Sequence, residues 1–138
     1  MIISTFSSYS KYIAIPRKHI YGIIFFILGS FDGLKDLESL DLKNNRLTIL
    51  PSYIFSQTRR LTQVDLSNNR LRTLSGVFLD LSALEEVFLN DNLLLQLTDD
   101  WFHNTPNLHA IHLQNNVIFE IEENALQPLK RLSRLILR

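Results

Sequence analysis

The 138-residue sequence contains no cysteine and carries no net charge at neutral pH. Without cysteine the chain can form no disulfide, no thiolate metal site and no thiol-based catalytic centre. A balanced charge provides no basic face for a phosphate backbone, so we predict no nucleic-acid partner. The apolar run at residues 20–28 is shorter than the roughly 20 residues that a transmembrane helix needs, so membrane attachment would require flanking sequence.

Motifs of common enzymes are also missing. The sequence has no Walker loop and no HExxH, GxSxG or GxGxxG motif. Asp41 and Asp65 fall on adjacent predicted strands, but nothing around them indicates a pocket for general acid–base chemistry. His109 and His112 are three residues apart along a predicted strand, so they point to opposite faces and do not share a metal. We therefore predict no enzyme activity, no cofactor and no metal.

What the sequence does contain is an internal repeat. The leucines that begin each unit are separated by 24, 23, 24 and 24 residues: Leu37, Leu61, Leu84, Leu108 and Leu132. Each full unit fits the pattern LxxLxLxxNxLxxL, and four consecutive matches are not a chance event. Residues 37–138 are therefore predicted to form four full repeats and one partial repeat.

Each repeat begins with a stretch in which apolar and polar residues alternate, which predicts a short strand. The expected strands are Ser39–Lys43, Gln63–Ser67, Glu86–Asn90, Ala110–Gln114 and Arg134–Arg138. Stacked in parallel, they place the apolar positions inward: Leu40, Leu42, Val64, Leu66, Val87, Leu89, Ile111, Leu113, Leu135 and Leu137. We predict an α/β solenoid, a horseshoe with a parallel concave sheet and a convex side of turns or 3₁₀ segments.

Two further columns are predicted to hold the repeats together. An asparagine recurs where the chain turns after each strand, and a buried amide there can satisfy inward-facing backbone groups. This asparagine ladder is Asn45, Asn69, Asn92 and Asn116. Stacked aromatic rings fill the space behind the sheet. This phenylalanine column is Phe31, Phe55, Phe78 and Phe102.

The ends of the chain permit several interpretations. Residues 1–20 are a leader of uncertain structure, and residues 21–36 are either a degenerate capping repeat or part of a secretory signal. An artefactual or unrelated leader is the third interpretation. In the capping repeat the 24-residue spacing would place Pro16 within the strand, so its first half is not expected to fit. At the other end nothing caps the leucine column, so we expect a fragment, a truncated product, or a partner packed on that end.

From Leu37 to Arg138 the sequence resembles the "typical" subclass of leucine-rich-repeat proteins. The period of 24 residues and the back-half pattern xxxxFxxLxxL, as in LPSYIFSQTRRL, carry this resemblance. It is similar to the ectodomains of animal Toll-like, slit-like and chaoptin-like cell-surface proteins. The resemblance implies a non-enzymatic recognition module at the cell surface or outside the cell, which binds a protein through its concave face.

Two features depart from that subclass, because the chain lacks both cysteine-rich caps and an N-x-[ST] glycosylation sequence. A cytosolic scaffold or regulatory subunit is therefore the alternative. A third hypothesis is a protein whose enzyme domain lies beyond Arg138.

Outward strand positions supply the predicted binding residues, and we expect them to be free of packing constraints. The candidates are Asp41, Lys43, Gln63, Asp65, Glu86, Phe88, Asn90, His112 and Gln114. Phe88 is the best anchor, because an aromatic on a polar face is typical of a binding hot spot.

Overall fold

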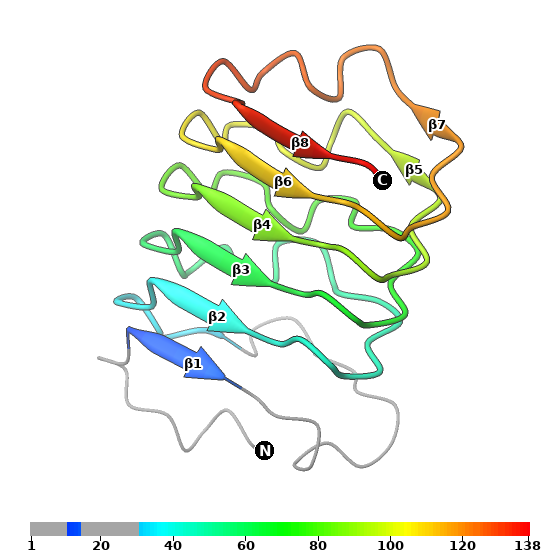
Figure 1. Ribbon diagram of the computed structural model, residues 1–138. Helices are drawn as coiled ribbons and strands as arrows, with labels where there is room; N and C mark the ends of the chain where they lie inside the picture. Colours follow the sequence, from blue (N-terminus) through cyan, green and yellow to red (C-terminus); the bar gives the residue numbers. More distant parts are fainter. Residues whose placement is uncertain (1–10, 15–30) are drawn as a thin grey trace.

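The computed structural model describes residues 11–14 and 31–138 (Figure 1). A six-stranded parallel sheet in the order β1-β2-β3-β4-β6-β8 runs along its length. Its strands are β1 (Tyr12–Ala14), β2 (Ser39–Asp41), β3 (Gln63–Asp65), β4 (Glu86–Phe88), β6 (Ala110–His112) and β8 (Arg134–Ile136). One coil of chain separates each strand from the next, so the predicted solenoid with a parallel sheet is confirmed.

The strands are aligned at equivalent repeat positions. Leu40 is the register partner of Val64, Val64 of Val87, and Val87 of Ile111. The side chains of these residues are almost completely buried, as the period-two alternation predicts. Their stacking forms a continuous apolar column inside the coils.

β1 corrects one expectation. The 24-residue spacing would have put Pro16 in the first strand, but Tyr12 is the register partner of Ser39, which lies 27 residues later (39 − 12). A proline has no N–H to donate to a sheet, and a strand at residues 12–14 avoids it. The expectation that the first half of this repeat would not fit is therefore wrong. The choice between a capping repeat and a signal falls mainly on residues 15–30, outside the described residues.

The back of the described solenoid consists of turns and bends, with no helix. It also carries a second, two-stranded parallel sheet that the sequence pattern did not predict, formed by β5 (Gln96–Leu97) and β7 (Glu120–Ile121). No helix among the described residues is long and apolar enough to cross a membrane.

The asparagine ladder joins neighbouring coils. Asn69 Nδ2 donates to the carbonyl oxygens of Leu42, one repeat earlier, and Leu66, both at 3.0 Å. Its Oδ1 accepts the backbone N–H of Leu47 at 3.0 Å. Asn92 makes the equivalent bonds one repeat later. The residue before each ladder asparagine has a left-handed backbone, which short polar side chains tolerate: Asn44, Asn68, Asp91 and Asn115.

The phenylalanine column lies behind the sheet. Ring centroids are separated by 5.3 Å between Phe31 and Phe55, 6.2 Å between Phe55 and Phe78, and 5.6 Å between Phe78 and Phe102. All four side chains are completely buried, so one aromatic stack runs through four coils. Such rings combine a large buried apolar area with favourable stacking.

The shortest repeat is made possible by a glycine. Gly76 has a φ of +67°, and a β-carbon at this position would lie 2.9 Å from Ser52 Cβ in the preceding coil. Its carbonyl oxygen accepts the N–H of Tyr53 at 2.8 Å. A side chain here would therefore both strain the backbone and collide with the neighbouring repeat.

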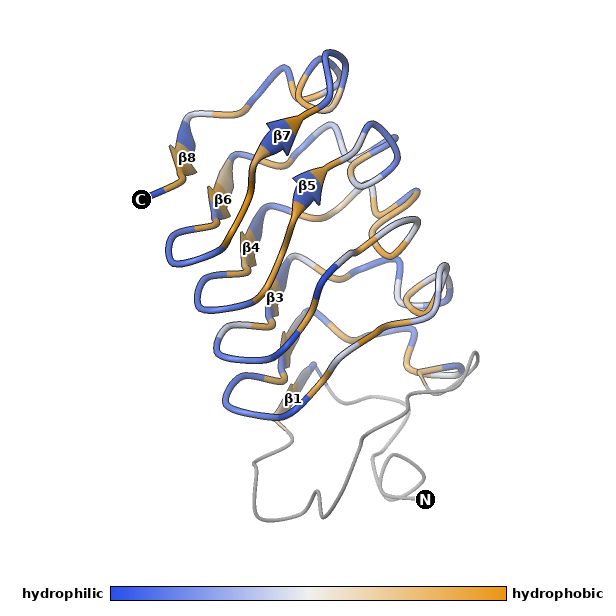
Figure 2. Ribbon diagram, turned by 90° about the vertical axis from the view of Figure 1, so that its right-hand side faces the viewer, coloured by the Kyte–Doolittle hydropathy of each residue, from blue (hydrophilic) through white to orange (hydrophobic). Residues whose placement is uncertain are grey.

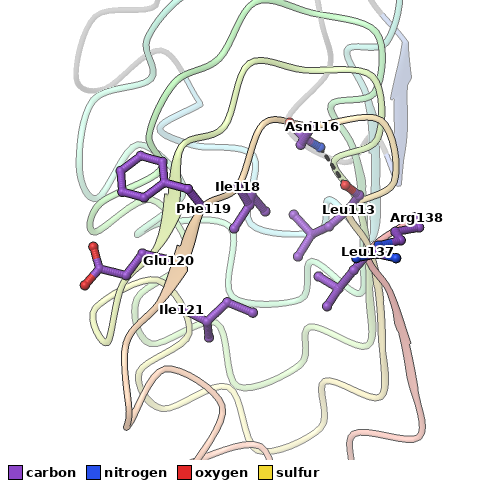
Figure 3. A pocket seen from close by; sticks show the side chains of 8 residues that line it. All are labelled: Leu113, Asn116, Ile118, Phe119, Glu120, Ile121, Leu137 and Arg138. Carbon is purple, nitrogen blue, oxygen red and sulfur yellow. Dashed lines mark hydrogen bonds between the residues drawn. The ribbon is translucent and has the colours of Figure 1, made fainter.

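The core is less well covered at its C-terminal end. Figure 3 shows a hollow of about 350 Å³, with Leu113, Ile118 and Leu137 beside it. Leu137 was predicted to be an inward residue, but it is 42% exposed because no coil follows β8. Ile121 is 40% exposed, whereas its equivalent one repeat earlier, Leu97, is fully buried. The hollow is thus the uncovered interior of the last coil.

Candidate protein-binding face

The outward side chains of the six-stranded sheet form the surface that was predicted to bind a partner, and we call it the sheet face. In β2, β3 and β4 the middle residue is buried and the two flanking residues are partly exposed. The predicted residues within the strands are Asp41, Gln63, Asp65, Glu86, Phe88 and His112. The other three, Lys43, Asn90 and Gln114, follow the strands.

One end of the sheet face carries an acidic cluster. Lys43 Nζ lies 3.3 Å from Asp41 Oδ2 and 3.9 Å from Asp65 Oδ2. Tyr12 Oη donates to Asp41 Oδ2 at 3.4 Å. The hydrogen bond to Asp41, together with the attraction of both carboxylates, raises the pKa of Lys43 above its ordinary value. Lys43 therefore carries a full positive charge between two carboxylates at neutral pH.

The centre of the sheet face is an aromatic pair. The Phe88 ring is stacked on the His112 imidazole, with 4.4 Å between centroids and 16° between planes. His112 is only 9% exposed, and its Nε2 lies 2.9 Å from Glu86 Oε1. Gln63 Nε2 donates to the other Glu86 oxygen at 3.2 Å, and an Arg134 guanidinium nitrogen lies 4.0 Å from Oε1.

These contacts correct the expectation that sheet-face side chains are free of packing constraints. Glu86, Phe88 and His112 hold one another across β4 and β6, so their positions are set before any partner arrives. Two residues of the face were missed by the sequence reasoning, Tyr12 and Arg134. Arg134 could have been found one repeat beyond Ala110, whereas Tyr12 required knowledge of the displaced β1.

The described residues contain no group of three histidine or acidic side chains able to hold a metal ion. Glu86 and His112 form a pair without a third ligand. The arrangement on the sheet face is therefore one for contact: a central aromatic surface, carboxylates on both sides, and two cations at the margins.

The repeat geometry agrees with the comparison with known families. Residues 6–133 match the family described as "BspA type Leucine rich repeat region", in six copies. The chain belongs to the leucine-rich-repeat family. Six copies extend the repeat beyond residues 37–138, as does the participation of β1 in the sheet.

The leucine-rich-repeat relatives come from animals. The chain is 33% identical to chicken (Gallus gallus) Tsukushi over 110 residues, covering 75% of this chain and 29% of the relative. It is 34% identical to human (Homo sapiens) Epiphycan over 108 residues, covering 75% and 31%. In the solved Toll–Spatzle complex of Drosophila, a chain with 25% identity superposes with a TM-score of 0.69 over 75% of this chain and 14% of that one.

These proteins place the chain in the animal extracellular class of leucine-rich-repeat proteins, as the resemblance in the sequence indicated. The cytosolic alternative receives no support from them. The chain spans less than a third of the relatives' length, so it corresponds to a segment of their repeat arrays. The related families are non-enzymatic and consistent with protein recognition.

Proposed function

We propose that this leucine-rich-repeat chain binds a protein partner through its sheet face, as part of a cell-surface or secreted receptor. The observation that carries the proposal is the preordered cluster of Phe88, His112 and Glu86 in the middle of that face. A partner that meets an ordered aromatic surface loses less side-chain entropy on binding than one that must fix loose side chains.

The chemistry of the face indicates the complementary surface. Carboxylates of Asp41, Asp65 and Glu86 lie beside the aromatic pair, and Lys43 neutralises only part of their charge. A partner would place an apolar side chain against Phe88 and basic side chains near these carboxylates. Such complementarity favours fast association and discriminates against acidic proteins.

The relatives support a protein partner. One solved structure with the same repeat architecture is titled as the complex of Toll with Spatzle, and one relative is a zebrafish (Danio rerio) protein named as a transforming growth factor beta activator. Both names describe proteins that act through other proteins. For this chain, the identity of the partner is left to experiment.

The test is a panel of individually purified secreted and cell-surface proteins, probed with the full chain displayed as a multimer. Each positive partner is then titrated against wild type, Phe88→Ala and Asp65→Asn. Loss of a central hot-spot aromatic costs about 2 kcal/mol or more, which is a weakening of roughly 30-fold. Arg59→Ala, an exposed substitution on the back of the solenoid, is the matched control and should bind as wild type. Partners whose affinity ignores both sheet-face substitutions would contradict the proposal.

Cellular location separates the proposal from the cytosolic alternative. A C-terminally tagged chain expressed in animal cells should appear in the medium or at the cell surface. Exclusive recovery from the cytosol would favour an intracellular scaffold instead.

A further inference from the structure

A second surface lies to one side of the sheet face, where each coil leaves its ladder asparagine. We call this surface, made of residues 46–49, 70–73, 93–96 and 117–120, the lateral flank. Backbone hydrogen bonds connect its segments: Arg70 N donates to Leu47 O at 2.8 Å, and Leu93 N donates to Leu71 O at 2.9 Å. Phe119 N donates to Leu95 O at 3.0 Å. Equivalent residues of successive repeats therefore form straight columns across the flank.

The C-terminal half of the lateral flank is apolar and exposed. Leu93 is 39% exposed, Leu95 37%, Val117 54% and Phe119 72%. Figure 2 shows these apolar stretches leading into β5 and β7, and Figure 3 shows Phe119 pointing away from the interior of the last coil. Contiguous exposed apolar side chains of this kind mark interaction surfaces, whereas single ones need no explanation.

The N-terminal half of the same columns is basic. Arg46 and Arg70 occupy the positions that Leu93 and Val117 hold later, and Arg72 precedes Leu95 in its column. Among the residues that the structure describes, these three arginines form no ion pair, in contrast to Arg60, which lies 2.8 Å from Asp36.

A hollow of about 260 Å³ lies between the two arginine-bearing coils. It is lined by Asn44, Asn45, Arg46, Asn68, Asn69 and Arg70. Asn68 Nδ2 donates to Asn44 Oδ1 at 2.7 Å, which fixes the two outer asparagines beside it. A recess between two unpaired guanidinium groups is suited to a carboxylate, which arginine binds through two parallel N–H donors.

We propose that the lateral flank docks an extended segment of a protein partner that reads acidic-x-apolar-x-apolar. Neighbouring coils lie about 4.8 Å apart, so the Leu93 coil is about 7 Å from the middle of the hollow and the Val117 coil about 12 Å. An extended chain advances about 3.3 Å per residue with alternate side chains on one face, so residues i, i+2 and i+4 fall at about 0, 7 and 13 Å.

With the carboxylate of residue i between Arg46 and Arg70, the next two side chains on that face meet the two apolar coils. The segment crosses the coils at right angles, along the axis of the solenoid. The apolar and basic halves of the flank thus correspond to one ligand. This surface is separate from the sheet face, so a receptor built from this chain could hold two proteins at once.

The test uses the full chain and fluorescein-labelled peptides of nine residues, followed by fluorescence polarisation. The central sequence Glu-Ser-Leu-Ser-Phe is the probe, Lys-Ser-Leu-Ser-Phe reverses its charge, and Glu-Ser-Ser-Ser-Ser removes its apolar side chains. The first peptide should bind saturably and at least tenfold more tightly than the other two.

Variants then locate the site. Arg46→Glu combined with Arg70→Glu should weaken the first peptide at least tenfold and allow the lysine peptide to bind. Phe119→Ser should weaken the first peptide about tenfold, while Arg59→Ala is the control for loss of an exposed arginine. Phe88→Ala, which tests the sheet face, should leave the peptide affinity unchanged.

Three outcomes would overturn the proposal: no saturable binding of the first peptide, equal loss in Arg59→Ala, or affinity independent of the apolar positions. Vesicles containing anionic phosphatidylserine provide a further arm. If they bind the chain with the same dependence on Arg46, Arg70 and Phe119 while the peptides do not, the flank is a membrane surface and the peptide proposal is wrong.

Discussion

The asparagine ladder makes a quantitative prediction for Asn69→Leu. Asn69 is 7% exposed, and leucine removes its amide while keeping a similar volume. The Leu47 N–H then loses the Asn69 oxygen and stays buried, at a cost of about 1–3 kcal/mol. The Leu42 and Leu66 carbonyl oxygens retain one other asparagine donor each, so their loss adds roughly 1 kcal/mol. We expect the free energy of unfolding to fall by about 2–4 kcal/mol.

Urea unfolding followed by the fluorescence of Trp101, the single and fully buried tryptophan, measures this loss. The midpoint should shift while the slope stays constant, because the unfolded chain exposes the same surface. Asn116→Leu provides a graded comparison: Asn116 is half-buried, so its replacement should cost less. If Asn69→Leu unfolds at the wild-type midpoint, the ladder does not stabilise the fold and the reasoning fails.

Three other predictions concern the back of the solenoid. Phe78→Ala removes a ring stacked between two neighbours and should cost about 3–5 kcal/mol in urea unfolding, while an equal loss for an exposed aromatic such as Tyr53→Ala would contradict the role of the column. Gly76→Ala should cost at least about 1–2 kcal/mol from its positive φ alone, and Ser52→Gly in the same chain should recover part of this loss by removing the collision. Burial raises the pKa of Asp100, but hydrogen bonds from Ser75 and Thr98 outweigh it and hold that pKa below its ordinary value of 3.8. Stability from this carboxylate is therefore present above pH 3.8 and lost as the pH falls through the lowered pKa, so Asp100→Asn should make unfolding less dependent on pH below about 4; an unchanged pH dependence would show that Asp100 does not contribute.

Much of the fold could be predicted from the sequence, because burial and turn geometry repeat at a fixed spacing. The period set the register of β2, β3, β4, β6 and β8, and the asparagine and phenylalanine columns lie at the spacing that the sequence showed. β1 was missed because three additional residues separate it from β2, and a fixed period cannot show such an insertion. The pairing of β5 with β7 depends on two-residue contacts too short to leave a pattern.

The candidate site was predictable only in outline. Alternation showed which side chains face outward, so Phe88 and His112 could be placed on one surface. Their stacking, and the hydrogen bond of His112 with Glu86, depend on rotamers and on the distance between strands. The lateral flank was missed because its residues lie outside the strands, where the repeat pattern places no requirement on polarity.

The coil-to-coil hydrogen bonds described above also determine how the chain can reach its folded state. Nearly every bond between repeats joins residues 21 to 29 positions apart, as in Leu71 N to Asn92 Oδ1 or Asn92 Nδ2 to Leu66 O. Each added coil therefore closes a loop of about the same length, and the entropy cost of closure does not grow as the array lengthens. Folding can begin at any adjacent pair of repeats and extend in both directions, with each new coil using the previous one as its template. An array built in this way can gain or lose repeats in evolution without a new folding problem, and the relatives that share these coils can therefore be several times longer than this chain.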